Sequence, residues 1–230
     1  MTPLKNGNKN VIVWGDIHGC SRALIKAIEI SESCKFDTVF LGDYIDRGPD
    51  SVGCIDILIR AKERNKNWNF LMGNHEHMLL DLFMNPNLVN KSSKLLNGDN
   101  FSYFETSKTY FSLIHSDLKL MNVKSFLSNL QLFYKIDNWI FVHASLKNNA
   151  ISLDKKPLED LLWNYEEIPE WDRTYFVHGH NRVNQISMHG HGININTSCG
   201  FGGYLTGVII DIERNQIKKV LKISEDGQVL

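Results

Sequence analysis

Residues 11–19 read Val-Ile-Val-Trp-Gly-Asp-Ile-His-Gly, a short apolar run that breaks at a glycine into polar side chains. An apolar run of this length that stops at glycine is typical of a buried β-strand. Glycine allows the backbone to turn sharply and to approach a bound group closely. The stretch therefore predicts a strand that presents Asp16 and His18 just beyond its carboxyl end.

The same pattern returns at two later apolar runs. Residues 38–41 (Thr-Val-Phe-Leu) are followed by Gly-Asp-Tyr-Ile-Asp-Arg-Gly at 42–48. Residues 68–71 (Trp-Asn-Phe-Leu) are followed, after one methionine, by Gly-Asn-His-Glu at 73–76. Each run is again typical of a strand that ends in a polar loop.

Helical patterns lie between these runs. Ser21 is expected to cap a first helix, residues 51–67 form a second amphipathic pattern, and a third helix begins near His75. Strand, loop and helix in this alternation predict parallel strands with right-handed crossovers. Since ligands bind beyond the carboxyl ends of such strands, a set of polar side chains is expected to meet there: Asp16, His18, Asp43, Asp46, Asn74 and His75.

The remainder of the chain has two different characters. Residues 85–129 are rich in Asn, Ser and Lys with interspersed aromatic residues, and we expect helices and loops that cap one end of the sheet. From residue 131 onward, short runs predict mostly antiparallel strands at 132–136, 139–142, 174–177, 185–188, 193–196, 204–211 and 216–223. No long linker or repeat divides the chain, so we expect a single domain, 1–230, of the α/β (α+β) class.

The composition is that of an ordinary globular protein, with 43% hydrophobic and 22% charged residues. A net charge of −1 gives no broad attraction to nucleic acid or to an acidic membrane, so neither is an expected partner. The polar N-terminus lacks the apolar core of a signal peptide, and no apolar run reaches membrane-span length, which indicates a cytoplasmic protein. The cysteines form no Cys-x-x-Cys pair and are expected to be reduced thiols: Cys20, Cys34, Cys54 and Cys199.

Two later strand ends add histidines to the polar set. His143 follows the run at 139–142, and residues 177–180 read Val-His-Gly-His. Carboxylates, imidazoles and one amide form a mixed oxygen and nitrogen donor set that suits manganese, iron or zinc. Any one of these motifs alone is more typical of a solvated turn. Because all of them occur at strand ends, they together predict a metal site.

These motifs resemble the signature of the phosphoprotein phosphatase family of calcineurin-like metallophosphoesterases. The resemblance runs from about Val11 to Thr206. It is strongest to the compact bacterial and phage branch, which includes the phage lambda protein phosphatase and symmetrical dinucleoside tetraphosphate hydrolases. It implies a central β-sandwich of mixed sheets flanked by helices. It also implies two divalent metal ions, manganese with iron or zinc as alternatives, and phosphate ester hydrolysis by a metal-bound hydroxide.

The resemblance assigns the metal ligands by motif. Asp16, His18 and Asp43 would hold the first metal, and Asp43, Asn74, His143 and His180 the second, with Asp43 bridging. His180 follows glycine, as the family ligand does, whereas His178 is expected to pack or to make an indirect contact. The other histidines are given no catalytic role: His77, His115, His189 and His191.

Three residues are expected to act on the substrate. Arg47 can make bidentate contacts to phosphate oxygens. His75 is the expected general acid that protonates the leaving group, and Asp46 is expected to orient its ring and keep it charged. Residues 85–129 and Arg47 are expected to decide substrate preference, because the metals contact only the phosphate group that all candidate substrates share.

The sequence departs from the family pattern around the phosphate. Met72 and Tyr165 stand where many relatives have arginine, and Arg173 and Arg182 are the candidates to replace them. The leading interpretation is a serine/threonine protein phosphatase that acts on a phosphorylated protein or a small phosphoester. The first alternative is a dinucleoside polyphosphate (diadenosine tetraphosphate) hydrolase. The second is a non-catalytic phosphate-binding module, and the complete set of motif residues argues against it.

Overall fold

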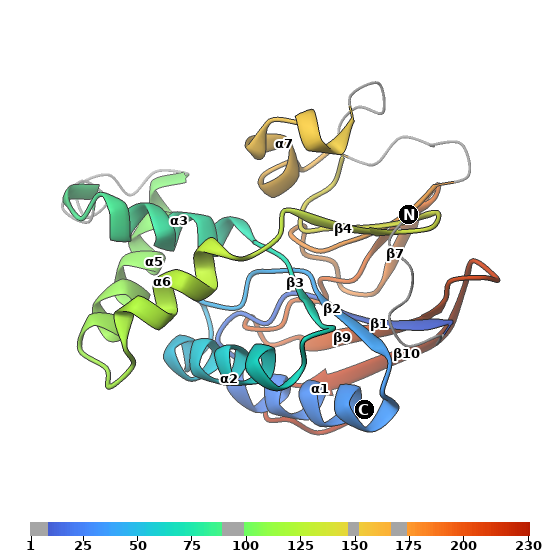
Figure 1. Ribbon diagram of the computed structural model, residues 1–230, viewed down its shortest axis with the longest axis horizontal. Helices are drawn as coiled ribbons and strands as arrows, with labels where there is room; N and C mark the ends of the chain where they lie inside the picture. Colours follow the sequence, from blue (N-terminus) through green and yellow to red (C-terminus); the bar gives the residue numbers. More distant parts are fainter. Residues whose placement is uncertain (1–8, 89–98, 147–151, 167–173) are drawn as a thin grey trace.

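The computed structural model of the protein describes residues 9–88, 99–146, 152–166 and 174–230 (Figure 1). Two five-stranded sheets have the strand orders β10-β9-β1-β2-β3 and β4-β5-β6-β8-β7. A core of buried side chains from both sheets lies between them. The predicted β-sandwich of mixed sheets flanked by helices is confirmed.

The first sheet is built as the early strand pattern predicts. Its strands are β1 (Asn10–Trp14), β2 (Asp37–Phe40), β3 (Asn69–Phe70), β9 (Tyr204–Asp211) and β10 (Gln216–Ser224). β1 pairs in parallel with β2, and β2 in parallel with β3. β9 runs antiparallel to both β1 and β10. The carboxyl ends of the three parallel strands therefore lie at one edge of the sheet.

The second sheet contains more parallel pairing than the sequence predicts. Its strands are β4 (Phe133–Ile136), β5 (Trp139–Val142), β6 (Tyr175–His178), β7 (Ser187–His189) and β8 (Gly192–Asn194). β6 is parallel to both β5 and β8, so the expectation of antiparallel hairpins is wrong for these three strands. The connection from β5 to β6 contains α7 (Leu158–Leu162) and is long enough for the crossover that parallel strands need.

Helices cover the sandwich on both faces and at one end (Figure 1). α1 (Ser21–Cys34) and α2 (Ser51–Arg64) lie on the outer face of the first sheet, and α7 lies beside the second. α3 (Asn74–Met84), α5 (Asp99–Ile114) and α6 (Leu120–Ser128) gather at one end. α5 and α6 are the described part of the predicted cap, whose residues 89–98 lie outside the described residues. No helix in the described segments is both long and apolar enough to cross a bilayer.

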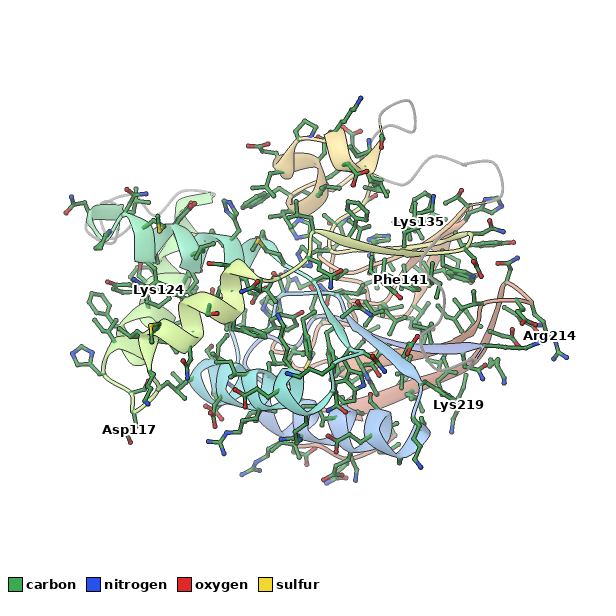
Figure 2. The ribbon with its side chains drawn as sticks, in the orientation of Figure 1. Asp117, Lys124, Lys135, Phe141, Arg214 and Lys219 are labelled. Atoms are coloured by element: carbon green, nitrogen blue, oxygen red, sulfur yellow. The ribbon has the colours of Figure 1, made fainter. Side chains whose placement is uncertain are left out.

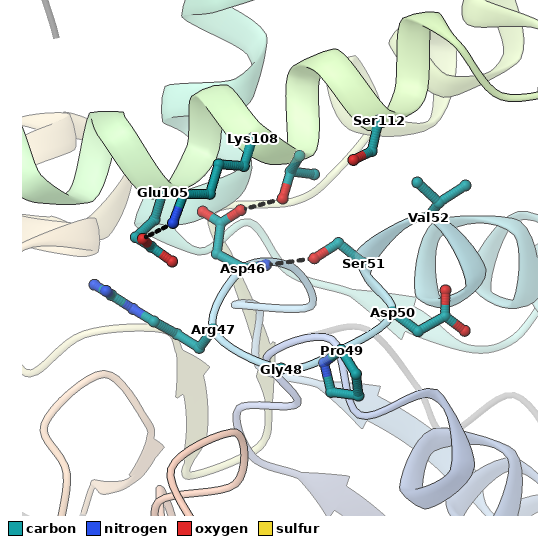
Figure 3. A pocket seen from close by; sticks show the side chains of 11 residues that line it. Asp46, Arg47, Gly48, Pro49, Asp50, Ser51, Val52, Glu105, Lys108 and Ser112 are labelled. Atoms are coloured by element: carbon teal, nitrogen blue, oxygen red, sulfur yellow. Dashed lines mark hydrogen bonds and ion pairs between the residues drawn. The ribbon is translucent and has the colours of Figure 1, made fainter. Parts of the chain in front are cut away.

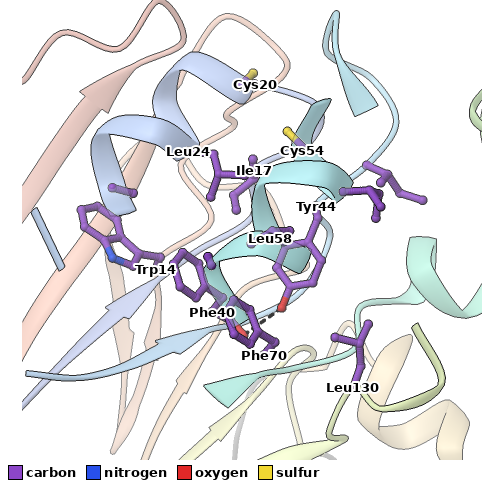
Figure 4. Close-up of a cluster of buried hydrophobic side chains, with 14 of the residues drawn as sticks. Trp14, Ile17, Cys20, Leu24, Phe40, Tyr44, Cys54, Leu58, Phe70 and Leu130 are labelled. Atoms are coloured by element: carbon purple, nitrogen blue, oxygen red, sulfur yellow. Dashed lines mark hydrogen bonds between the residues drawn. The ribbon is translucent and has the colours of Figure 1, made fainter. Parts of the chain in front are cut away.

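β1 is buried on both faces. Val11 and Val13 point into the core between the sheets, where Phe141 of β5 also lies (Figure 2). Trp14 points the opposite way, into the core beneath α1 and α2 (Figure 4), and its Nε1 donates to Ser31 Oγ of α1 at 2.8 Å. Two-sided burial explains why the sequence reads as a continuous apolar run rather than an alternating one.

The start of α1 corrects one local prediction. Ser21 is the first residue of α1 rather than its N-cap, and no side chain caps this helix. The preceding residue, Cys20, turns inward and is buried. α2 does have a side-chain cap, because the Asp50 side chain accepts a hydrogen bond from Gly53 N at 2.8 Å.

Candidate metal centre

Asp43 lies at the centre of the polar residues that follow the strands. Its Oδ2 is 3.6 Å from His18 Nε2, and its Oδ1 is 3.4 Å from His143 Nε2. Two groups of potential ligand atoms share Asp43: one adds His18 and His75, and the other adds His143 and His180. The loops that follow β1, β2, β3, β5 and β6 therefore meet at one edge of the sandwich, as the sequence predicts.

Backbone contacts orient the histidines towards Asp43. His18 Nδ1 lies 2.9 Å from Ile45 O, and His143 Nδ1 lies 3.0 Å from Leu41 O, so each Nδ1 donates and each Nε2 is left with a lone pair. Burial lowers the pKa of His18 to about 4 and of His180 to about 3. His180 Nδ1 faces the side-chain amide of Asn74 at 3.2 Å, and its Nε2 is buried without a hydrogen-bond partner. Neutral imidazoles with unused lone pairs are the ligand form of histidine, so these residues fit a divalent cation.

Asn74 begins α3 and faces the same point. Its Oδ1 lies 3.1 Å from His143 Nε2, so two atoms that carry lone pairs face each other. A cation between them would satisfy both atoms, as would an amide turned so that its NH2 group donates to Asp43 and His143. The adjacent Glu76 supports the loops from below, because its carboxylate accepts the backbone N–H groups of Gly73, Asp43 and Tyr44. Burial and Asp43 raise the pKa of Glu76 to about 8.

Asp16 lies beside the cluster but in neither group of mutually close ligand atoms. Its Oδ2 accepts hydrogen bonds from Asn196 Nδ2 at 2.6 Å and from His180 N at 3.1 Å. A Cβ at Gly179 would lie 1.9 Å from Asp16 Oδ1, so this close approach requires glycine. Burial and the nearby Asp43 raise the pKa of Asp16 well above its usual range. A bound cation would stabilise the charged form of Asp16, which burial and Asp43 disfavour.

The backbone itself is strained around this cluster. Positive φ angles between 45° and 68° occur at His18, Asp43, Asp46, Arg47 and His180. Side chains other than glycine rarely adopt this left-handed conformation, and such residues concentrate at functional sites. Hydrogen bonds between loops hold it in place, for example from His18 N to Asp43 O at 2.9 Å.

His75 and Asp46 form a buried pair next to the cluster. His75 Nδ1 lies 2.6 Å from Asp46 Oδ2. Burial opposes the charge of the imidazole, but Asp43 and Asp46 raise the pKa of His75 to about 9. Thr106 and Thr109 of α5 donate to the two oxygens of Asp46. No sequence motif marks these threonines, which lie far from Asp46 along the chain.

A cavity of about 400 Å³ opens over the cluster. It is lined by His18, Asp43, Arg47, Asn74, His75, Tyr165, His180, Arg182 and Phe201. The guanidinium carbons of Arg182 and Arg47 lie 4.2 and 5.6 Å from the centre of the Phe201 ring. Tyr165 is 68% exposed and its ring lies 4.4 Å from that of His180. Of the two arginine candidates, Arg182 lies at the cavity, and Arg173 lies outside the described residues.

The remaining histidines lie away from this cavity. His178 is buried at the end of β6, and burial lowers its pKa to about 4. His77 on α3 faces Asp81 and Trp163, and His115 is exposed near the end of α5. His189 and His191 lie on and after β7. None of these five belongs to the groups of potential metal ligands found among the described residues.

A third group of potential ligands, Cys20, Cys199 and Glu225, lies beneath the same loops. Both thiols bond to backbone carbonyls of the loop after β1, Cys20 to His18 O and Cys199 to Ile17 O. Glu225 accepts the N–H groups of Gly200 and Gly202. These contacts fix the loops that carry His18 and Phe201.

Comparison with known proteins agrees with this arrangement. A serine/threonine-protein phosphatase of Salmonella typhimurium is 28% identical over 214 residues, which cover 86% of this chain and 90% of the relative. An asymmetrical bis(5'-nucleosyl)-tetraphosphatase of a Geobacillus species is 26% identical over 226 residues, covering 84% and 87%. Among solved structures, a cold-active protein-tyrosine phosphatase of a Shewanella species has a TM-score of 0.61 at 17% identity, covering 97% of this chain and 80% of that one.

A second solved structure, a metallophosphoesterase of Sphaerobacter thermophilus, has a TM-score of 0.56 at 14% identity, covering 94% of this chain and 88% of that one. At these identities the two structures show a shared fold. The family described as calcineurin-like phosphoesterase matches residues 9–198. The chain therefore belongs to the calcineurin-like phosphoesterase family and is a metal-dependent phosphatase.

Proposed function

We propose that the chain is a serine/threonine protein phosphatase that works with two divalent metal ions. The proposed ligands are Asp16, His18 and Asp43 for one metal and Asp43, Asn74, His143 and His180 for the other. The groups of close ligand atoms that share Asp43 support the assignment of His18, His143 and His180. Asn74 is supported by its Oδ1, which lies 3.1 Å from His143 Nε2, and Asp16 is assigned by its motif. The nitrogen and oxygen donors suit manganese, with iron or zinc as alternatives. Bound metals would supply an acidified water as nucleophile and positive charge for the phosphate.

The His75–Asp46 pair is the observation that favours a phosphoserine or phosphothreonine substrate. The alkoxide of serine or threonine is a poor leaving group and gains most from a proton in the transition state. His75 is held by Asp46 through Nδ1, and its raised pKa keeps the ring protonated at neutral pH. We assign the transfer of this proton, from His75 Nε2 to the leaving oxygen, to His75. Arg47, in the same cavity, is assigned to the phosphate oxygens.

Hydrolysis of a dinucleoside polyphosphate is the second candidate, and the mouth of the cavity favours it. Arg47 and Arg182 flank Phe201, and Tyr165 is exposed nearby. Two cationic groups suit a chain of several phosphates, and exposed aromatic rings suit stacking on a base. The leaving group of such a substrate is itself a phosphate, so it needs little help from a general acid.

A second cavity of about 300 Å³ bears on this choice. It lies between the loop 46–52 and α5, and Arg47 lines both cavities (Figure 3). Glu105 and Lys108, which form an ion pair, line it from α5. We propose that this cavity receives the part of the substrate beyond the ester oxygen. Because α5 lines this cavity, residues 85–129 of the single domain 1–230 would then influence substrate preference.

The deciding experiment compares the two substrates on the same metal-loaded protein. We expect a higher kcat/KM for a phosphoserine peptide than for diadenosine tetraphosphate, because only the peptide gains fully from His75. Preference for the tetraphosphate, lost on Arg182→Ala, would instead establish the second candidate. Elemental analysis of the same sample measures the metal. Less than one metal per chain after manganese loading would contradict the binuclear site.

A further inference from the structure

Thr106 and Thr109 lie one turn apart on α5, and both are buried, at 0% and 5% exposure. Thr106 Oγ1 donates to Asp46 Oδ2 at 2.6 Å, and Thr109 Oγ1 donates to Asp46 Oδ1. We propose that these two threonines are positioning residues for proton transfer, because they hold Asp46 in the orientation that aims His75 at the leaving group. The inference rests on the general acid role proposed above for His75.

The donors around Asp46 leave its carboxylate little freedom. Oδ2 is bonded to His75 Nδ1 at 2.6 Å and to Thr106, while Oδ1 is bonded to Thr109. The Asp46 backbone is also held, because its N–H donates to Ser51 Oγ at 2.8 Å. A carboxylate bonded on both oxygens has a fixed plane, and a ring that donates to it takes its direction from that plane. Without the threonines, the bond to His75 is the one that would still orient the carboxylate among the described residues.

The helix that carries the threonines is itself anchored to the catalytic elements. One turn before Thr106, Tyr103 OH donates to Asp81 Oδ2 of α3 at 3.0 Å, and α3 is the helix that begins with Asn74 and His75. In Figure 3, α5 passes directly over Asp46, with Glu105 and Lys108 on the side of the second cavity. α5 therefore bonds to Asp46 through Thr106 and Thr109, and it lines the second cavity with the neighbouring residues Glu105 and Lys108.

This arrangement predicts an effect that depends on the leaving group. A general acid accelerates the departure of a serine alkoxide far more than that of p-nitrophenolate, which leaves without protonation. Loss of the threonines should therefore slow hydrolysis of a phosphoserine peptide and spare that of p-nitrophenyl phosphate. Neither metal binding nor phosphate binding should change, because the hydrogen bonds that place the threonines in the site go to Asp46, which is neither a proposed metal ligand nor a proposed phosphate ligand.

The test compares Thr106→Val/Thr109→Val with the matched Thr106→Ser/Thr109→Ser protein, both loaded with manganese. Valine keeps the shape and removes the hydroxyl, whereas serine keeps the hydroxyl. We expect the valine protein to lose roughly 10- to 100-fold in kcat on the peptide, the usual effect of losing such a supporting hydrogen bond, with KM unchanged. The serine protein should keep most of the activity. Ser107→Ala, which alters a buried contact of the same helix to Tyr103 O, is the control for general perturbation of α5.

A double-mutant cycle separates positioning from a structural effect. If the threonines act through Asp46, the valine substitutions should cost no further activity in an Asp46→Asn background. Equal losses on both substrates, or additive losses in that background, would overturn the inference. His75→Asn distinguishes the two proposals. If kcat on the peptide falls with His75→Asn but not with the valine protein, only the role of the threonines is contradicted. If His75→Asn lowers kcat equally on the peptide and on p-nitrophenyl phosphate, or not at all, the general acid role of His75 is contradicted. Should the double variant melt below the assay temperature, the single Thr106→Val and Thr109→Val proteins are measured by the same criteria.

Discussion

Replacing Arg182 by alanine is expected to lower kcat/KM about tenfold, because we expect Arg182, which lines the cavity, to bind phosphate in place of the arginines absent at Met72 and Tyr165. A charge-assisted hydrogen bond is worth about 1.5–3 kcal/mol, and about 1.4 kcal/mol is a factor of ten. Arg182 is exposed at the rim of the cavity, so solvent screening places its contribution at the lower end of that range. The more buried Arg47 should contribute more, so Arg47→Ala should cost about a hundredfold by the same reasoning.

The assay measures kcat and KM separately on p-nitrophenyl phosphate, where the leaving group makes few contacts. Arg182→Lys should recover only part of the loss, because an ammonium cannot form the two parallel bonds of a guanidinium. Arg214→Ala is the matched control, since Arg214 lies at the far end of the sheets (Figure 2). If kcat/KM of Arg182→Ala were within about twofold of the parent value, the reasoning would be refuted, because loss of a charged contact to phosphate should have a larger effect.

Four further predictions concern the buried centre. His75→Asn should lower kcat on a phosphoserine peptide by about 10²–10⁴-fold and on p-nitrophenyl phosphate much less, and an equal loss on both would count against an acid role. Asp43→Asn should deplete both metals in elemental analysis, because each carboxylate oxygen faces a different histidine; a full metal content would contradict its bridging role. Chelation should lower the melting temperature, since buried carboxylates at Asp16 and Asp43 then lose the compensating charge. Glu76→Gln should lower the free energy of unfolding in urea by about 1–3 kcal/mol, because the amide keeps one acceptor oxygen and its NH2 group cannot accept the backbone N–H groups bonded to the other, and an unchanged midpoint would contradict this.

The strands could be predicted from sequence because their signal is local. Each early strand is an apolar run that stops at glycine, and β9 matches its predicted range of 204–211. Strand direction in the second sheet could not be predicted in the same way. β6 pairs in parallel with β5 and β8, and this depends on where the long connection after His143 carries the chain rather than on the composition of the strands.

The candidate site was predictable where ligands follow strand ends. That rule brought Asp43, His18 and His143 together, and it would also have identified Asn196, which follows β8 and binds Asp16. Thr106 and Thr109 have no such signal, since threonines one turn apart on a helix are common. Only the tertiary packing of α5 against the loop 46–52 shows what they contact.

The predictable features concern the metal ligands, whereas the unpredictable ones concern the residues around the substrate. The ligand motifs each lie within a few residues of a strand end, so relatives that act on different substrates can share them. A protein phosphatase and a dinucleoside tetraphosphatase match this chain at 28% and 26% identity over most of its length, a difference too small to choose between them. The residues that can discriminate are supplied from elsewhere: Arg182 and Phe201 from loops of the second half, and the α5 side chains from the cap. Because we expect the leaving group to contact these residues and not the metals, kinetics on matched leaving groups can assign the substrate, which motif comparison cannot do.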